Sequence, residues 1–176
     1  MPEKLSDDFL PPYSYVPGGP WPHPISSPQG HSHGQRDVKV PPILNDDWEQ
    51  SPMFLKGVRL FNAGYYWEAH EAWESLWHAH GRQGAEADML KALIKLAAAG
   101  VKYREGQPHG IETHSRRAGA IFRSLRKRTS PRIFGLDLKR LEEFADAIAA
   151  NPDIVVVPRT ARVHRVFAYQ IEPTKD

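Results

Sequence analysis

The sequence LFNAGYYWEAHEAWESLWHAH occupies residues 60–80 and contains the features from which the rest of the fold can be worked out. The letters NAG at 62–64 are typical of a helix end, because glycine accepts a positive φ without a Cβ clash. We therefore expect a turn at Gly64, followed by a helix from about Tyr65 to about Ala79. The stretch also holds three glutamates and three histidines, which makes it the first candidate for a functional site.

At about 100° per residue, this helix gathers most of its large aromatic side chains on one face. The aromatic residues of that face are Tyr66, Trp67, Trp73 and Trp77. Four ionisable residues share it, namely His70, Glu71, Glu74 and His78. An aromatic face is normally buried and uncharged, so carboxylates there must be paired, protonated or bound to a cation.

Four further segments have the helical spacing of apolar residues and are bounded by capping or turn signals. They cover about residues 51–64, 86–104, 108–127 and 137–150. Ser51 is a good N-cap, and Pro52 is tolerated at the first helical position. Residues 97–100 read Ala-Ala-Ala-Gly, a run of small side chains that lets another helix approach closely.

The segments 60–73 and 102–115 share one plan, in which a helix, a glycine, a short turn and a second helix follow each other. Their separation is about 42 residues, in the range of helical-hairpin repeats such as tetratricopeptides. Two hairpins are too few for a solenoid. The sequence therefore predicts an all-α fold, a compact bundle of about five helices built from helical hairpins.

Three segments differ in composition: a Pro-rich extended arm at 1–46, a helical domain at 47–152 and a tail at 153–176. Ten of the sixteen prolines lie in the arm, which excludes helix and central strand there. The aromatic residues of the arm lead us to expect that it lies partly against the helical body. The tail begins with the β-prone run IVVV at 154–157, so we expect a short hairpin or an extended arm packed on the helices.

The composition excludes some classes of protein. The 176 residues carry a net charge of +2 and contain no cysteine, so there are no disulfides and no thiolate ligands. The first residues lack a basic start and an apolar run, and no apolar stretch has the length of a membrane span. We expect a cytoplasmic protein with no membrane partner. The balanced charge gives no general argument for nucleic acid, whereas a protein partner, a small-molecule ligand and a homo-oligomer all stay open.

One set of residues resembles the Domain of Unknown Function 309 family of small all-helical proteins. The residues that carry the resemblance are Phe61, Asn62, Gly64, Tyr66, Glu68, Ala69, His70, Glu71, Glu74 and Trp77, followed by Leu93, Ile94, Leu96, Ala97 and Ala98. The resemblance covers about residues 55–128. It implies packed helical hairpins, and it implies no activity.

A divalent metal ion is the one cofactor for which the sequence offers ligands. The candidates are His70, Glu71, Glu74 and His78, at spacings of one to four residues on one helix face. A second helix would have to supply further ligands, for which Glu112 and His114 are available. The zincin pattern His-Glu-x-x-His fails because Glu74 stands in its last place, and the di-iron pattern is absent.

Two other interpretations of the same residues stay open. In the first, Glu71 and Glu74 belong to a buried polar network, with four basic residues as candidate partners. Those residues are Lys95, Arg104, Arg116 and Arg117. In the second, His70, Glu71 and Glu74 act as general acids or bases without a metal.

The sequence favours a binding or interaction module, because no complete catalytic set is present. The candidate binding residues are Tyr66, Trp67, Trp77, Arg116 and Arg117. The alternative is a metal- or carboxylate-dependent hydrolase-like enzyme that uses His70, Glu71 and Glu74.

Overall fold

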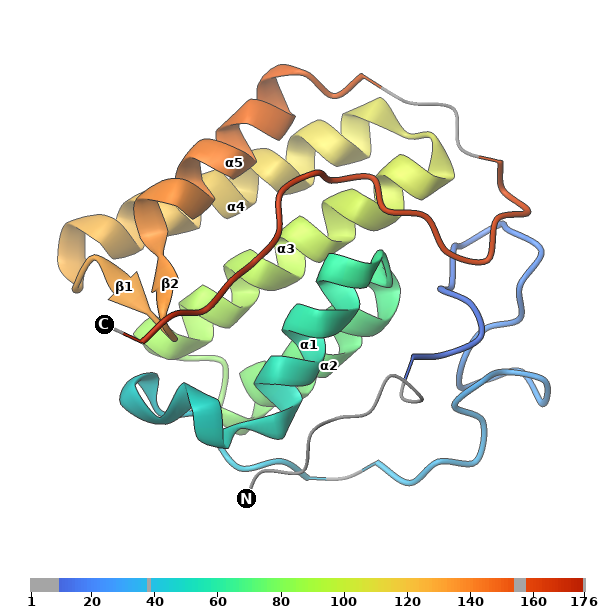
Figure 1. Cartoon of the computed structure of the whole chain (residues 1–176), viewed down its shortest axis with the longest axis horizontal. Helices are drawn as coiled ribbons and strands as arrows, with labels where there is room; N and C mark the ends of the chain where they lie inside the picture. The colour runs from blue at the N-terminus through green and yellow to red at the C-terminus, as the bar shows by residue number, and fades with distance from the viewer. Residues whose placement is uncertain (1–9, 38, 154–157, 176) are drawn as a thin grey trace.

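Five α-helices follow one another in the computed structural model, which describes residues 10–37, 39–153 and 158–175 (Figure 1). They are α1 (Pro52–Ala63), α2 (Tyr66–Ala79), α3 (Ala85–Glu105), α4 (Pro108–Arg128) and α5 (Leu138–Ala150). A 3₁₀ helix, η2 (Asn45–Gln50), precedes α1, and the short antiparallel strands β1 (Arg132–Ile133) and β2 (Leu136–Asp137) precede α5. The expected all-α bundle is confirmed.

The helices begin and end where the sequence places them, because the caps form as expected. The Ser51 side chain accepts a hydrogen bond from the Phe54 N–H, at 3.3 Å, and Pro52 opens α1. At α5, Asp137 accepts from the N–H groups of Lys139 and Arg140, at 2.9 and 3.1 Å.

The two helical hairpins share one turn geometry. Gly64 ends α1 with φ 93°, and Gly106 ends α3 with φ 69°. The N–H after each glycine donates to a carbonyl five residues back, from Tyr65 to Leu60 (2.8 Å) and from Gln107 to Lys102 (3.0 Å). The weak repeat is therefore two copies of the same C-terminal helix cap.

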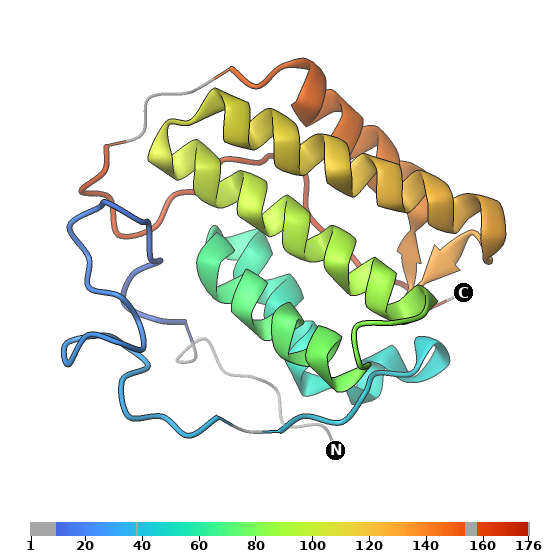
Figure 2. The same ribbon diagram turned by 180° about the vertical axis from the view of Figure 1, so that it is seen from behind.

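Each helix packs on the next, and α3 lies in the middle of the bundle (Figures 1 and 2). The α2–α3 contact is close because Gly100 of α3 has no side chain. A Cβ at Gly100 would overlap the ring of Tyr66, which is fully buried. The prediction that residues 97–100 admit a neighbouring helix is confirmed at this contact.

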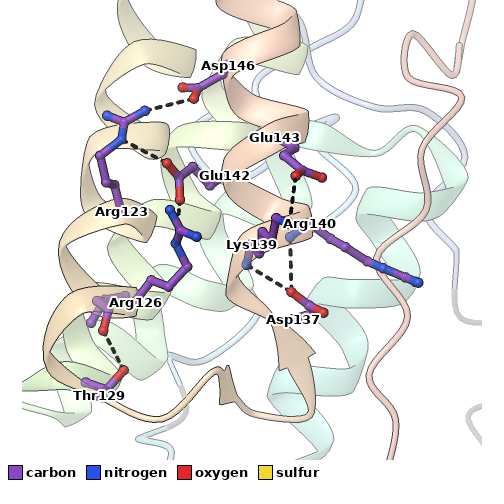
Figure 3. A network of polar contacts seen from close by, with 10 residues as sticks. Arg123, Arg126, Thr129, Asp137, Lys139, Arg140, Glu142, Glu143 and Asp146 are labelled. Atoms are coloured by element: carbon purple, nitrogen blue, oxygen red, sulfur yellow. Dashed lines mark hydrogen bonds and ion pairs between the residues drawn. The ribbon is translucent and has the colours of Figure 1, made fainter.

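The basic residues of α4 pair with α5 (Figure 3). Arg123 donates to Glu142 and to Asp146, both at 2.8 Å, and Arg126 contacts Glu142 at 2.9 Å. Glu142 is buried, so two guanidinium groups compensate its carboxylate. Much of the positive charge on α4 therefore serves the α4–α5 contact.

The arm contains no regular secondary structure between residues 10 and 37, and it lies against the helical body. Tyr13 and Val16 are buried. The Tyr65 hydroxyl donates to the Pro11 carbonyl at 2.8 Å, and the Ser14 N–H donates to the Arg162 carbonyl at 2.8 Å. The expected docking of the arm is confirmed for these residues.

The tail at 158–175 runs as an extended segment across α3 (Figure 1). Phe167 is buried against the rings of Phe61, at 5.7 Å, and Tyr66, at 5.3 Å. The side-chain amide of Asn62 donates to the Ile171 carbonyl and accepts from its N–H, both at 2.8 Å. The extended alternative holds for this part, whereas the β-prone run at 154–157 lies outside the described residues.

No helix within the described ranges is both long and apolar enough to cross a membrane. The expected division into an arm, a helical domain and a tail stays a prediction.

Candidate functional site

The buried side of α2 differs from the predicted aromatic face. Tyr66 and Trp73 are buried as expected, but they share this side with Ala69 and Leu76. The charged half of the predicted face points toward solvent, since the side chains of Glu74 and His78 are 41% and 46% exposed. The prediction of a buried charged face is therefore wrong for these two residues. Because α2 packs between α1 and α3, its buried side centres on the small residues.

Glu68 is the most buried carboxyl group of α2, with 6% exposure. The backbone N–H of Tyr15, in the arm, points at both of its oxygens, at 3.2 and 3.3 Å. The pKa of Glu68 is raised to about 8, mainly by burial. The nearby Glu71 adds to the rise, and hydrogen bonds from Ser14 and Tyr15 oppose it. Glu68 is therefore mostly protonated at neutral pH.

Glu71 lies one turn from Glu68, half-buried. The Trp67 indole N–H donates to its Oε1 at 3.0 Å. Burial raises the pKa of Glu71, and the hydrogen bond from Trp67 and the positive potential of His70 and His23 oppose the rise. On α1, burial lowers the pKa of Lys56, and the charge of Glu71 opposes that shift. Glu71 and Lys56 thus act on each other across the α1–α2 hairpin.

A cavity of about 710 Å³ separates the arm from this hairpin. We call it the arm cavity. Its polar lining includes Lys56 of α1, and Glu68, Glu71 and Ser75 of α2. Its apolar lining is Leu10, Pro11, Pro12 and Ile25 of the arm, with Met53, Leu60 and Ala72 of the helices. Two carboxyl groups with raised pKa values therefore line the same cavity.

The arm adds His31 to the same cavity. Its Nε2 is buried and has no hydrogen-bond partner within the described part of the chain, while its Nδ1 lies 2.9 Å from the Ser32 hydroxyl. Burial lowers the pKa of His31, and the charge of Lys56 lowers it further. His31 is therefore a neutral polar group in the cavity wall at neutral pH.

The four candidate metal ligands lie in two separate places. Glu74 contacts His70 at 3.6 Å and His78 at 3.8 Å, while Glu71 faces Trp67 and the arm cavity. Among the described residues, no group of three or more His, Asp or Glu side chains is arranged to hold a metal ion. A metal bound by His70, Glu71, Glu74 and His78 stays a prediction.

None of the four expected basic partners of Glu71 and Glu74 pairs with either carboxylate among the described residues, and two of them bind elsewhere. Arg104 donates to the Ala161 carbonyl in the tail at 2.8 Å, and Arg116 binds Glu112 within α4. The lysine or arginine whose charge interacts with Glu71 is Lys56, which the sequence did not single out. The network prediction therefore had the wrong partners.

The candidate binding residues have different roles. The Tyr66 hydroxyl accepts from the N–H groups of Val166 and Phe167, at 2.9 and 3.3 Å, so it holds the tail. Trp67 orients Glu71, and Trp77 lies under the Arg82 guanidinium at 5.2 Å. Arg116 and Arg117 are exposed on α4, far in sequence from the arm cavity residues.

Residues 54–113 match the family model described as Domain of unknown function (DUF309). This segment of the chain is similar to the DUF309 family. The match confirms the resemblance over a shorter segment than the expected 55–128. No protein with a curated description matches the chain.

The DUF309 segment contains α1 from Phe54, α2, α3 and the beginning of α4. It therefore supplies Lys56, Glu68 and Glu71, which form the helical wall of the arm cavity. The opposite wall comes from the arm, outside the segment.

Proposed function

We propose that this protein is a ligand-binding module, and that the arm cavity takes a small molecule with an apolar body and a cationic nitrogen. The observation that carries the proposal is that Glu68 and Glu71 line the same cavity. Its volume of about 710 Å³ falls within the range of about 300–1,000 Å³ that is usual for small-molecule sites.

The charge of the cavity supports a cationic ligand. Burial raises the pKa of both carboxyl groups, so neither carboxylate is fully compensated by its surroundings. An ammonium group between them would favour the ionised forms and lower both pKa values. Binding would then release protons at neutral pH, mainly from Glu68.

The shape of the lining supports the apolar body. About half of the remaining cavity lining is aliphatic and proline side chains from the arm, α1 and α2, and the polar remainder of the arm wall includes Gln35, Arg36 and Asp37. Aliphatic side chains shield the hydrocarbon part of a ligand from water but offer it no hydrogen bonds. Specificity would therefore rest on the carboxyl end of the cavity.

Calorimetric titration with phenethylamine and with 2-phenylethanol tests this proposal, since the two differ only in the charged head group. The amine should bind at least about tenfold more tightly, the range expected for charged hydrogen bonds. Titrations in buffers of different ionisation enthalpy should show proton release with the amine. Equal binding of both compounds, or binding of neither, would refute the amine-binding proposal.

Two variants of α2 provide a matched comparison. Glu71→Gln should weaken amine binding about tenfold or more, because it removes a carboxylate from the cavity. Glu74→Gln, one turn apart and half-exposed, should change it less than about twofold, because Glu74 is not part of the cavity lining. Equal losses of amine affinity in both variants would mean that the effect comes from the overall charge of the protein and not from a carboxylate in the arm cavity.

A second candidate function is a metal- or carboxylate-dependent hydrolase-like enzyme using His70, Glu71 and Glu74. It is favoured by the raised pKa of Glu71 inside a cavity, a common property of general acids and bases. Elemental analysis of purified protein should then find near-stoichiometric Zn, Mn, Fe or Ni, lost in Glu71→Ala and Glu74→Ala. Folded protein that takes up none of these ions would contradict the metal form. A cytoplasmic location also stays a prediction.

A further inference from the structure

A stripe of lysines runs along the least buried side of α3. Lys91, Lys95 and Lys102 recur at helical spacing, with Ala98 between the last two, while most of the other side chains of α3 are buried. The tail crosses the opposite side of α3, and no segment crosses this helix in the view from behind (Figure 2). Lys91 is exposed, and Lys95 and Lys102 are partly exposed.

A hollow of about 120 Å³ lies above the small side chain of Ala98. We call it the lysine hollow. Its lining is Pro17 of the arm, Trp67 and His70 of α2, and Ala98, Val101, Lys102 and Glu105 of α3. None of these residues lines the arm cavity, so the two spaces are separate.

Lys102 joins the hollow to α4. Its side chain lies across Gly110, where a Cβ would fall 2.7 Å from the Lys102 Cδ. Its ammonium group contacts Glu105 at 2.8 Å. The absence of a side chain at Gly110 therefore leaves room for Lys102 against α4, and the charge of Lys102 also acts on His114, one turn further on.

Two histidines on either side of the stripe have unused ring nitrogens. The Nδ1 atoms of His70, on α2, and His114, on α4, are buried without a hydrogen-bond partner among the described residues. The pKa of His114 is lowered to about 4, first by burial and then by the charges of Lys95, Lys102, Arg117 and His70, in that order. His114 thus lies in a strongly positive potential.

The positive charges that surround His114 are only partly matched by acidic side chains. In the described part of the chain, neither Lys95 nor Arg117 makes a hydrogen bond or an ion pair. Burial lowers the pKa of Lys95, and the charges of Arg117 and Lys91 lower it further. The acids near the cluster are Glu105, paired with Lys102, Glu74, 3.6 Å from His70, and Glu71, whose charge also interacts with His70.

We propose that this cluster binds a small oxyanion of the phosphate class. The cluster consists of His70, Lys95, Lys102, His114 and Arg117. Lysine supplies point charges, arginine a planar fork, and the histidines N–H donors, which together suit tetrahedral oxyanions. Two members of the cluster, His70 and Lys102, line the lysine hollow. This hollow is small for a whole metabolite, so the expected ligand is free phosphate or the terminal phosphate of a monoester.

The neighbouring arginines of α4 offer a matched test. Arg117→Gln and Arg116→Gln remove the same charge from adjacent exposed positions, but Arg116 already binds Glu112. In titrations with inorganic phosphate at low ionic strength, Arg117→Gln should weaken binding about tenfold, against less than about twofold for Arg116→Gln. Equal losses, or no binding by the wild-type protein, would overturn the proposal.

Phenyl phosphate distinguishes the two sources of the anion. Affinity equal to that of inorganic phosphate assigns the site to the free anion, and tighter binding assigns it to a monoester. Either result supports an oxyanion site, provided that Arg117→Gln weakens both. Unchanged melting temperatures of the two variants serve as the folding control.

The His114 ring gives an independent readout by NMR. A bound oxyanion stabilises the imidazolium form, so saturating sulfate should raise the pKa of His114 by at least about one unit. Sulfate suits this test because it does not titrate between pH 4 and pH 8. A pKa of His114 that stays unchanged in sulfate would overturn the proposal even if Arg117→Gln behaved as expected.

Discussion

The backbone N–H of Tyr15 points at both carboxyl oxygens of Glu68, at 3.2 and 3.3 Å. This contact joins the Pro-rich arm to the centre of α2, between residues 53 positions apart. Glu68 also lines the arm cavity. The same carboxyl group therefore holds the arm in place and faces whatever enters beneath it.

Glu68 should make stability depend on pH. Its pKa is raised on folding from an ordinary value of 4.5 to about 8, so folding takes up a proton between these values. The stabilisation of the folded state by this proton uptake is fully present below about pH 4.5 and is lost as the pH rises to about 8. Urea unfolding should show Glu68→Gln gaining stability relative to wild type between pH 5 and pH 8.5, by about 2–5 kcal/mol.

The control for this experiment is Glu74→Gln, at a half-exposed position on the same helix. Its stability relative to wild type should stay nearly constant over the same pH range. Parallel curves for Glu68→Gln and wild type would show that Glu68 titrates normally in the folded protein.

Glu74→Gln itself should change stability only slightly. The sequence alone placed Glu74 in a buried network, where this change would cost about 1–3 kcal/mol. Its side chain is 41% exposed, and its contacts with His70 and His78 are longer than 3.5 Å. We expect a loss below about 0.5 kcal/mol by thermal unfolding at pH 7. A loss above about 1 kcal/mol would restore the network interpretation.

Gly100→Ala should destabilise the protein by about 1–3 kcal/mol. The new methyl group would overlap the Tyr66 ring, and this ring cannot move freely because its hydroxyl binds the tail. Gly110→Ala is the matched control in α4, where the methyl group meets only the flexible Lys102 side chain. The control should be neutral or stabilising by up to about 1 kcal/mol, since alanine favours helix. Equal effects of both changes in chemical denaturation would contradict the close α2–α3 contact.

Trp21 should be protected from collisional quenchers. Its ring stacks on Tyr13 with centroids 5.5 Å apart, and the Arg162 guanidinium lies 5.2 Å from its ring centre. The difference in iodide quenching between wild type and Trp21→Phe isolates its emission from that of the other four tryptophans. Tyr13→Ala should increase its accessibility. Full exposure of Trp21 in the wild-type protein would refute docking of the arm.

The helices could be predicted because their boundaries depend on local chemistry. Ser51, Pro52 and Gly64 determine the ends of α1 through their own backbone and side-chain preferences. The same applies to Gly106, so the repeated hairpin was visible without any tertiary information. Capping acts within one turn of helix, and a single sequence contains that information.

The site was harder to predict because its parts are far apart in the sequence. A helical projection of α2 ranks residues by size and polarity, and it put Glu68 between the two faces, although neighbours on both sides bury it. Lys56 looked like an ordinary surface residue of α1. The other cavity wall is an arm without regular structure, whose position follows from no periodicity.

Two hydrogen bonds between the Asn62 side chain and the Ile171 backbone attach the tail to α1, so they limit where this protein can be truncated. Phe61 and Tyr66 lie within the DUF309 segment, yet Phe167 covers both rings and Tyr66 binds the backbone of the tail. A fragment ending at residue 113 would expose these rings, together with the surface of α3 that most of α4 covers. The segment that matches the family model is therefore smaller than the part of the chain that forms the folded core.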